Sequence, residues 1–157
     1  MSAVVQHFLR RARDFEYSMK LCTRTSLDIE VQIVNTGIPQ SNESLQSAAL
    51  LGIHAAISYA DALRIGLGDT ELSADDHKQA ARRLEQAIAA KRLQDQTGIQ
   101  QFNALMGKKN AIAYGKSRTS DNDLKSIVES SQRFSSWINR VGKQLNVEGW
   151  VNVARQE

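Results

Sequence analysis

Apolar residues recur along most of the chain at the spacing of an α-helix. In residues 3–24 they follow alternating steps of four and three, which predicts one buried helical face with the arginines outside; these residues are Val4, Phe8, Ala12, Phe15, Met19 and Cys22. Residues 43–67 are apolar nearly all round and rich in alanine, a pattern that predicts a helix at the centre of a bundle. Gly66 and Gly68 are expected to end that helix in left-handed cap positions.

Three further helices are predicted in the second half of the chain. Ser73, followed three residues later by an acidic side chain, is typical of the N-cap of a helix, here over residues 74–92. A fourth helix ends near Gly115 and is marked by Ile99, Phe102, Leu105 and Met106. Ser120 is expected to cap a fifth helix, whose apolar stripe comprises Leu124, Ile127, Val128, Phe134, Ile138, Val141 and Leu145.

The segment 26–38 departs from helical spacing. Its apolar residues alternate with polar ones, which is the period of a strand half-buried on one face; they are Leu27, Ile29, Val31 and Ile33. A lone strand would need a partner, either in a local hairpin or across a dimer. The alternative is an irregular loop whose apolar side chains lie on the bundle.

These elements together predict the fold class. One proline and nine glycines are few chain breakers, which favours long helices. Trp150 and Val151 are expected to pack back onto the bundle as a hydrophobic latch. We therefore predict an all-α, up-down bundle of about five helices in a single domain, residues 1–157, with a short strand or a loop at 26–38. A chain of this length can bury most of its surface in one core.

Composition indicates an ordinary globular protein. Apolar residues make up 41% of the chain and charged residues 24%, as in soluble domains. The lone Cys22 cannot form an internal disulfide, which fits a reducing compartment. No apolar run approaches the roughly 18 residues that span a bilayer, and the N-terminus lacks a hydrophobic signal core. We expect a cytoplasmic location and no membrane contact.

The net charge of +3 is distributed unevenly. Residues 1–24 carry five bases and two acids, and residues 96–120 carry four bases and no acid. Residues 25–95 are acidic, with six bases and ten acids, and the remainder balances. The two basic segments would form an anion-binding face if they lie together. The alternative is that both are solvated helix flanks.

Three features of this chain resemble the HEPN superfamily, the "higher eukaryotes and prokaryotes nucleotide-binding" helical bundles. They are the small-residue helix Ala48–Leu63, a short helix opened by Asp76-His77, and the segment Lys109-Asn-Ala-Ile-Ala-Tyr114. The resemblance covers roughly residues 45–145, and its specificity comes from the order and spacing of the three features.

The last of these features departs from the family pattern. Family members that cleave RNA carry an arginine, usually followed by a polar residue, and a histidine four to six residues after the arginine; dimerisation brings two such motifs into one cleft. Here Lys109, Asn110 and Tyr114 occupy these positions. Tyrosine titrates near pH 10, whereas a histidine pKa of about 6.5 suits proton transfer near neutral pH. Lysine lacks the planar, bidentate grip of arginine on phosphate. The resemblance thus implies binding with impaired catalysis.

Two residues of the central helix are further candidates. Asp61 lies in the most apolar helix, where a buried carboxylate needs a paired charge or several donors; Lys109 or Asn110 would supply them. The alternative is that Asp61 faces solvent near the helix end. His54 is either a buried packing residue or part of the cleft beside the Lys109–Tyr114 segment. No cluster has the spacing of a metal site and no phosphate loop or nucleophile elbow is present, so neither a metal nor a cofactor is expected.

The function predicted from the sequence is RNA or nucleotide binding through a basic cleft of Lys108, Lys109, Asn110, Tyr114, Lys116 and Arg118. The resemblance implies a homodimer of a bacterial toxin–antitoxin or phage-defence type, with a cognate protein partner. The alanine-rich helix and the unpaired strand also favour a homodimer. Two alternatives stay open. One is an active, metal-independent RNase toxin in which Lys109, Tyr114 and His54 still cleave; the other is a structural or adaptor dimer.

Overall fold

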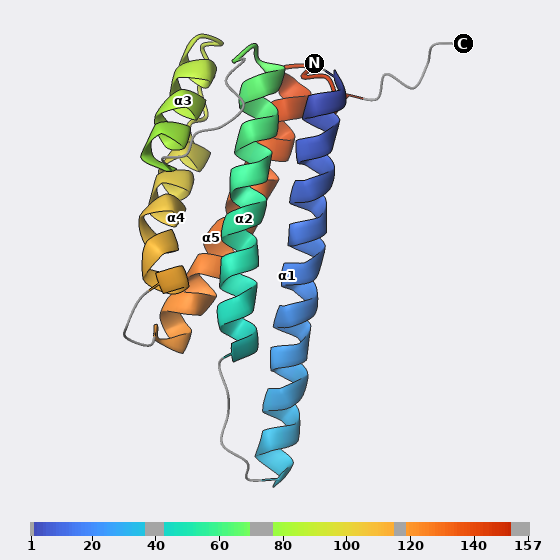
Figure 1. The fold of residues 1–157 in the computed structure, drawn as a ribbon, viewed down its shortest axis with the longest axis vertical. Coiled ribbons are helices and arrows are strands. Elements are labelled where there is room, and N and C mark those ends of the chain that lie inside the picture. The colour runs from blue at the N-terminus through green and yellow to red at the C-terminus, as the bar shows by residue number, and fades with distance from the viewer. Residues whose placement is uncertain (1, 37–42, 70–76, 115–118, 152–157) are drawn as a thin grey trace, which may run out of the picture.

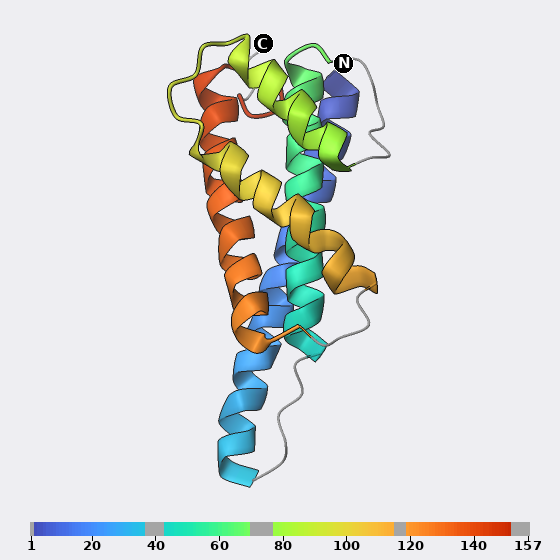
Figure 2. The ribbon, with the colours of Figure 1, turned by 90° about the vertical axis from the view of Figure 1, so that its left-hand side faces the viewer.

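The computed structural model describes residues 2–36, 43–69, 77–114 and 119–151, and it shows an all-α bundle without a strand in these ranges. The helices are α1 (Ser2–Thr36), α2 (Glu43–Gly66), α3 (His77–Ala89), α4 (Thr97–Tyr114) and α5 (Asp121–Gln144). The three longest helices lie side by side, and α3 and α4 cover one side of the bundle (Figure 1, Figure 2). The predicted fold class is confirmed.

Helix α2 is the centre of the bundle, as its all-round apolar pattern predicts. It packs against every other helix. Its small residues are at most 4% exposed; they are Ala48, Ala49, Ala55, Ala56, Ala60 and Ala62. At Gly52, a Cβ would lie 2.5 Å from Oγ of Ser131 on α5 and 2.9 Å from Sδ of Met19 on α1. The small residues therefore allow close helix approach within this chain.

The burial of α2 also bears on whether this helix would span a membrane. Within the described residues one helix, Ser44–Gly66, is long and apolar enough to cross a bilayer by length and composition. The expectation that no run reaches this length is therefore wrong. In the folded chain 72% of that window is buried, as in the core helix of a bundle.

Helix α1 continues through residues 26–36, so the predicted strand or loop is wrong there; residues 37 and 38 lie outside the described residues. The same apolar residues also satisfy a helical spacing, because Leu27 and Val31 are four residues apart, as are Ile29 and Ile33. Short apolar runs cannot be assigned by periodicity alone. The last turns of α1 extend beyond the first turn of α2 (Figure 1).

Both sequence-based reasons for a homodimer lose their support in this fold. The alanine-rich helix is covered by the other helices of its own chain, and the supposed unpaired strand is a helix whose backbone bonds are satisfied internally. The homodimer remains a proposal that depends on the family resemblance.

Helix α5 and the residues after it agree closely with the sequence pattern. Oγ of Ser120 accepts a hydrogen bond from the backbone N–H of Asp123 at 3.2 Å, which confirms the N-cap. The stripe from Leu124 to Val141 is buried, and Leu145 is partly buried. Trp150 is buried and donates from Nε1 to Oδ1 of Asn139 at 2.9 Å. The latch is confirmed for Trp150 and wrong for Val151, which is exposed.

The ends of the other helices are close to those predicted. Gly68 has a φ of 107° and supplies the left-handed turn after α2. Gly66 is instead the last helical residue, and a side chain there would collide with Val147. Helix α3 is described from His77 to Ala89, whereas its predicted start at residue 74 and the Ser73 N-cap lie outside the described residues.

Two glycines of α4 provide a matched test of this packing. A Cβ at Gly98 would overlap the indole ring of the buried Trp137, whereas nothing lies within 4 Å of a Cβ at Gly107. We expect Gly98→Ala to lower the free energy of unfolding by about 1–3 kcal/mol, because the backbone must shift. Gly107→Ala should raise it by up to about 1 kcal/mol, because alanine favours the helix interior. Urea denaturation measures both; shifts of equal sign would contradict this packing.

Candidate nucleic-acid interface

The last turns of α4 carry the basic residues that the sequence singles out. Lys108 and Asn110 are exposed and Lys109 is half-buried. In this region α4 leaves α5 and runs toward the beginning of α2 (Figure 2). There Nε2 of Gln46 on α2 donates to the carbonyl oxygen of Ile112 at 3.4 Å. The basic end of α4 is thus positioned by a contact between two helices.

A hollow of about 330 Å³ lies at this contact, lined by Gln46, Ser47, Leu50, Ile112 and Ala113. Residues three and four apart share a helix face, so Lys109 lies on the face of Ile112 and Ala113. The α2 side supplies an amide and a hydroxyl, which donate hydrogen bonds to oxygen acceptors. This arrangement of a cation beside polar donors suits an anionic group.

The partial burial of Lys109 changes its acid–base behaviour. Desolvation lowers the pKa of its ammonium group below the ordinary value of 10.5, because burial disfavours the charged form. A phosphate next to the ammonium would act in the opposite direction, since a nearby negative charge favours the protonated form. Ligand binding at Lys109 is therefore expected to be coupled to its protonation.

The remaining predicted contacts cannot all be placed. Tyr114 is the last residue of α4, and its side chain lies outside the described part of the chain, as do Lys116 and Arg118. His54 stacks on Phe15 of α1, with ring centroids 5.4 Å apart and an interplanar angle of 29°. It is not among the residues that line the hollow, so its observed role is packing between α1 and α2.

Asp61 has a different partner from the one predicted. Its Oδ1 lies 3.3 Å from Nη2 of Arg64, one turn further along α2. The α4 contact is made at Gln46, fifteen residues before Asp61 and about 22 Å away along the helix axis. The structure therefore pairs Asp61 with Arg64 and places it far from the basic end of α4.

The two basic segments of the sequence do not form one face. Helices α1 and α4 lie on opposite sides of the bundle (Figure 1). Only the α4 segment adjoins the hollow, so the arginines near the N-terminus belong to a separate surface.

A second polar groove, of about 440 Å³, lies between α4 and α5. Its lining includes Thr97, Gln101, Glu129, Arg133, Ser136 and Arg140. Charge summed by segment does not reveal this groove, because the acids of α5 offset its bases. The signal that would have found it is spacing: Lys125, Glu129, Arg133, Ser136 and Arg140 recur at steps of three and four, along one face of α5.

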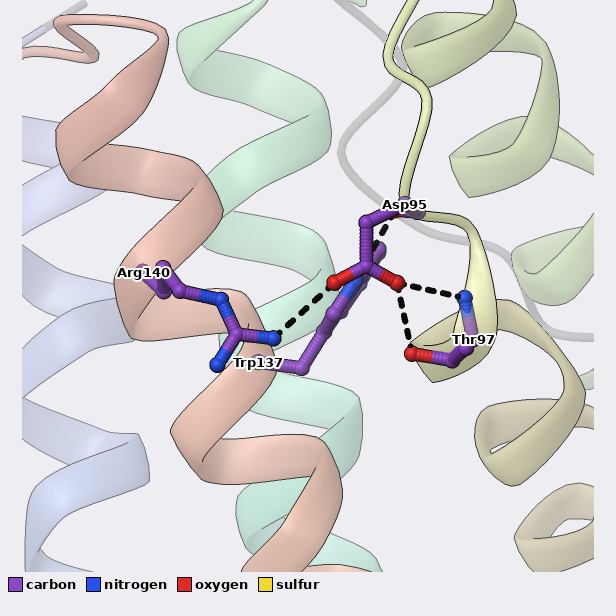
Figure 3. Close-up of polar contacts among 4 residues, drawn as sticks. All are labelled: Asp95, Thr97, Trp137 and Arg140. Carbon is purple, nitrogen blue, oxygen red and sulfur yellow. Dashed lines mark hydrogen bonds and ion pairs between the residues drawn. The ribbon is translucent and has the colours of Figure 1, made fainter.

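One end of this groove is held by a polar network around Asp95 (Figure 3). Its Oδ1 accepts hydrogen bonds from Oγ1 and N of Thr97 at 2.7 and 3.2 Å. Its Oδ2 lies 3.0 Å from Nη2 of Arg140, and its carbonyl oxygen accepts from Nε1 of Trp137 at 3.1 Å. The hydrogen bonds from Thr97, and after them Arg140, hold the pKa of Asp95 below its usual value. Asp95 thus stays charged and orients Arg140.

The described residues contain no group of three or more His, Cys, Asp and Glu side chains that could hold a metal ion. Comparisons of the chain with protein-family models, with curated proteins and with solved structures found no match.

Proposed function

We propose that this chain is an HEPN-like protein that binds RNA or a nucleotide through the basic end of α4. The observation that carries the proposal is the half-burial of Lys109, which lies one helical turn before Ile112 and Ala113, two residues that line the hollow between α2 and α4. A partly desolvated ammonium on the helix face that borders this hollow, whose α2 side carries amide and hydroxyl donors, suits a phosphate oxygen. Lys108 adds an exposed charge one residue away.

The same residues argue against efficient RNA cleavage. Tyr114 stands where the family's nucleases carry histidine, and a phenol with a pKa near 10 is a poor proton acceptor at neutral pH. We therefore propose a catalytically impaired, cytoplasmic member of a toxin–antitoxin or phage-defence system. An active RNase toxin is the alternative within the same family.

A structural or adaptor role is favoured by one feature of α1. Tyr17 and Leu21 are 66% and 43% exposed, and they are four residues apart, so they share a face of the helix. Large exposed apolar side chains on one face suit contact with another protein. This face is also a candidate contact for the homodimer and the cognate protein partner that the family resemblance implies.

Binding of a labelled single-stranded RNA at increasing salt tests the proposed function. We expect affinity to fall steeply between about 50 and 200 mM salt, because counterions are released when lysines contact phosphates. The RNA should remain intact with the wild type and with Tyr114→Phe. Cleavage that disappears in Tyr114→Phe would establish the RNase instead. A wild-type protein that binds no RNA at low salt would favour the adaptor.

A further inference from the structure

We propose that the groove between α4 and α5 binds the phosphodiester backbone of single-stranded RNA, with Arg133 and Arg140 as the phosphate contacts. The inference takes its ligand from the proposed function, and it adds a site on residues other than Lys108 and Lys109. It rests on the groove, on the two guanidinium groups and on the lack of a stacking surface.

Both arginines have guanidinium N–H groups that make no hydrogen bond within the described residues. Arg133 is exposed and makes no hydrogen bond or ion pair within the described residues, although Glu129 lies one turn away. Arg140 bonds Asp95 through Nη2, and its other two nitrogens make no bond in the described part of the chain. A guanidinium carries five N–H donors in a planar fork that matches phosphate. The Asp95 contact therefore uses Nη2 of Arg140 and leaves the N–H donors of its other two nitrogens for a phosphate.

The spacing of the charges suits a chain of anions. Arg133 and Arg140 are seven residues apart, which is two helical turns or about 10.5 Å along α5. Arg140 is held at the Asp95 end of the groove, away from Arg133. Lys125 and Lys143 are exposed beyond the two arginines. Such a row fits several phosphates along one strand better than one isolated phosphate group.

The groove has no platform for base stacking. Trp137 lines it but is 2% exposed, and its ring is packed beside Phe134 with centroids 5.8 Å apart. Its indole N–H donates a hydrogen bond to the carbonyl oxygen of Asp95. The remaining lining groups, such as Gln101 and Ser136, donate and accept hydrogen bonds. Recognition is therefore of the sugar–phosphate backbone, and the Glu129 carboxylate can accept from a ribose 2′-hydroxyl, which DNA lacks.

The groove is aligned with the basic end of α4. Lys108 follows Gln101 by seven residues, so both lie on one face of α4, about 10.5 Å apart along its axis. Gln101 lines the groove and Lys108 is exposed. A strand that lies in the groove and follows α4 therefore reaches the site of the proposed function.

The test is the binding of labelled single-stranded RNA to the full chain with Arg133→Gln and Arg140→Gln combined. The matched control is Arg10→Gln with Arg13→Gln, which removes the same charge from exposed positions of α1, on the far side of the bundle. Two lost phosphate contacts should make the fall of log affinity with log salt less steep, by about 1.4 in the slope. The control should keep the wild-type slope.

The outcomes separate the two proposals. Equal slopes for the groove variant and the α1 control would overturn the groove assignment. In that case the proposed function still stands if replacing Lys108 and Lys109 weakens RNA binding relative to the wild type. A wild-type protein that binds no RNA overturns both. Single-stranded DNA or an acidic peptide that competes as well as RNA of equal charge would overturn RNA as the occupant. Should the double variant fail to fold, Arg133→Gln alone carries the test, because the exposed Arg133 makes no hydrogen bond or ion pair within the described residues.

Discussion

Replacing Arg64 by alanine is expected to lower the free energy of unfolding by about 3–5 kcal/mol, the cost of breaking a buried ion pair from one side. Arg64 is 1% exposed. Its Nη2 lies 3.3 Å from Asp61 and its Nη1 lies 2.9 Å from Asp69. Alanine would leave two carboxylates with little solvation and no guanidinium. Because the carboxylates retain some contact with water, we expect a loss near the lower end of that range, measured by urea denaturation.

Companion variants show whether the guanidinium geometry matters. Arg64→Lys should recover part of the loss, since an ammonium supplies charge but not two divergent nitrogens. Asp69→Asn should cost less than Arg64→Ala, because Asp61 still pairs with the arginine. Asp61→Lys should be strongly destabilising, because it places a like charge beside Arg64. A loss below about 1 kcal/mol for Arg64→Ala, typical of exposed pairs, would contradict this reading of the cluster.

The Arg64 cluster also shows what sequence patterns did not reveal. The burial expected for Asp61 in the most apolar helix predicts a partner at Lys109 or Asn110 on another helix. Arg64, however, lies three positions later on the same helix, and residues three apart on a helix are neighbours. Arg64 also stands in the last turn of α2, where a cation is favoured by the helix dipole.

The bundle itself was largely predictable, because strong periodicity specifies which face of each helix is buried. The stripe of α5, the N-cap at Ser120 and the central position of α2 all follow from local pattern. The segment 26–36 did not, because an alternating apolar run in a long helix satisfies both periods. Local spacing could not decide between them.

The candidate site was predictable in part. Lys108 and Lys109 lie in a run without acidic residues, which can be recognised in the sequence without knowledge of the fold. The α4–α5 groove was not predictable in this way, because its arginines are two turns apart and a nearby acid offsets them in any segment sum. Only the helix spacing of α5, combined with its contact to α4, brings them together. The hollow beside Lys109 likewise depends on Gln46, which lies 66 residues from Ile112 in sequence.

The second large effect that we expect is a loss of RNA affinity when Lys108 and Lys109 are replaced. Replacing both by alanine should leave the fold intact, since one is exposed and the other half-buried, and should weaken RNA binding. Each phosphate contact removed lowers the slope of log affinity against log salt by about 0.7 for single strands, so the pair should lower it by about 1.4. Arg10→Ala with Arg13→Ala is the matched control on α1, and a double lysine variant that binds like that control would refute the α4 site.

The pKa of Lys109 allows the two lysines to be separated. Only the protonated ammonium attracts phosphate, and burial lowers the pKa of Lys109 from 10.5. As pH rises, wild-type affinity should therefore begin to fall below the pH at which an ordinary lysine loses its proton. Lys109→Ala should abolish that early fall, whereas Lys108→Ala should keep it and reduce affinity at every pH. Anisotropy titrations at fixed salt and increasing pH measure this difference, and identical pH profiles for the two variants would show that Lys109 does not contact the phosphate.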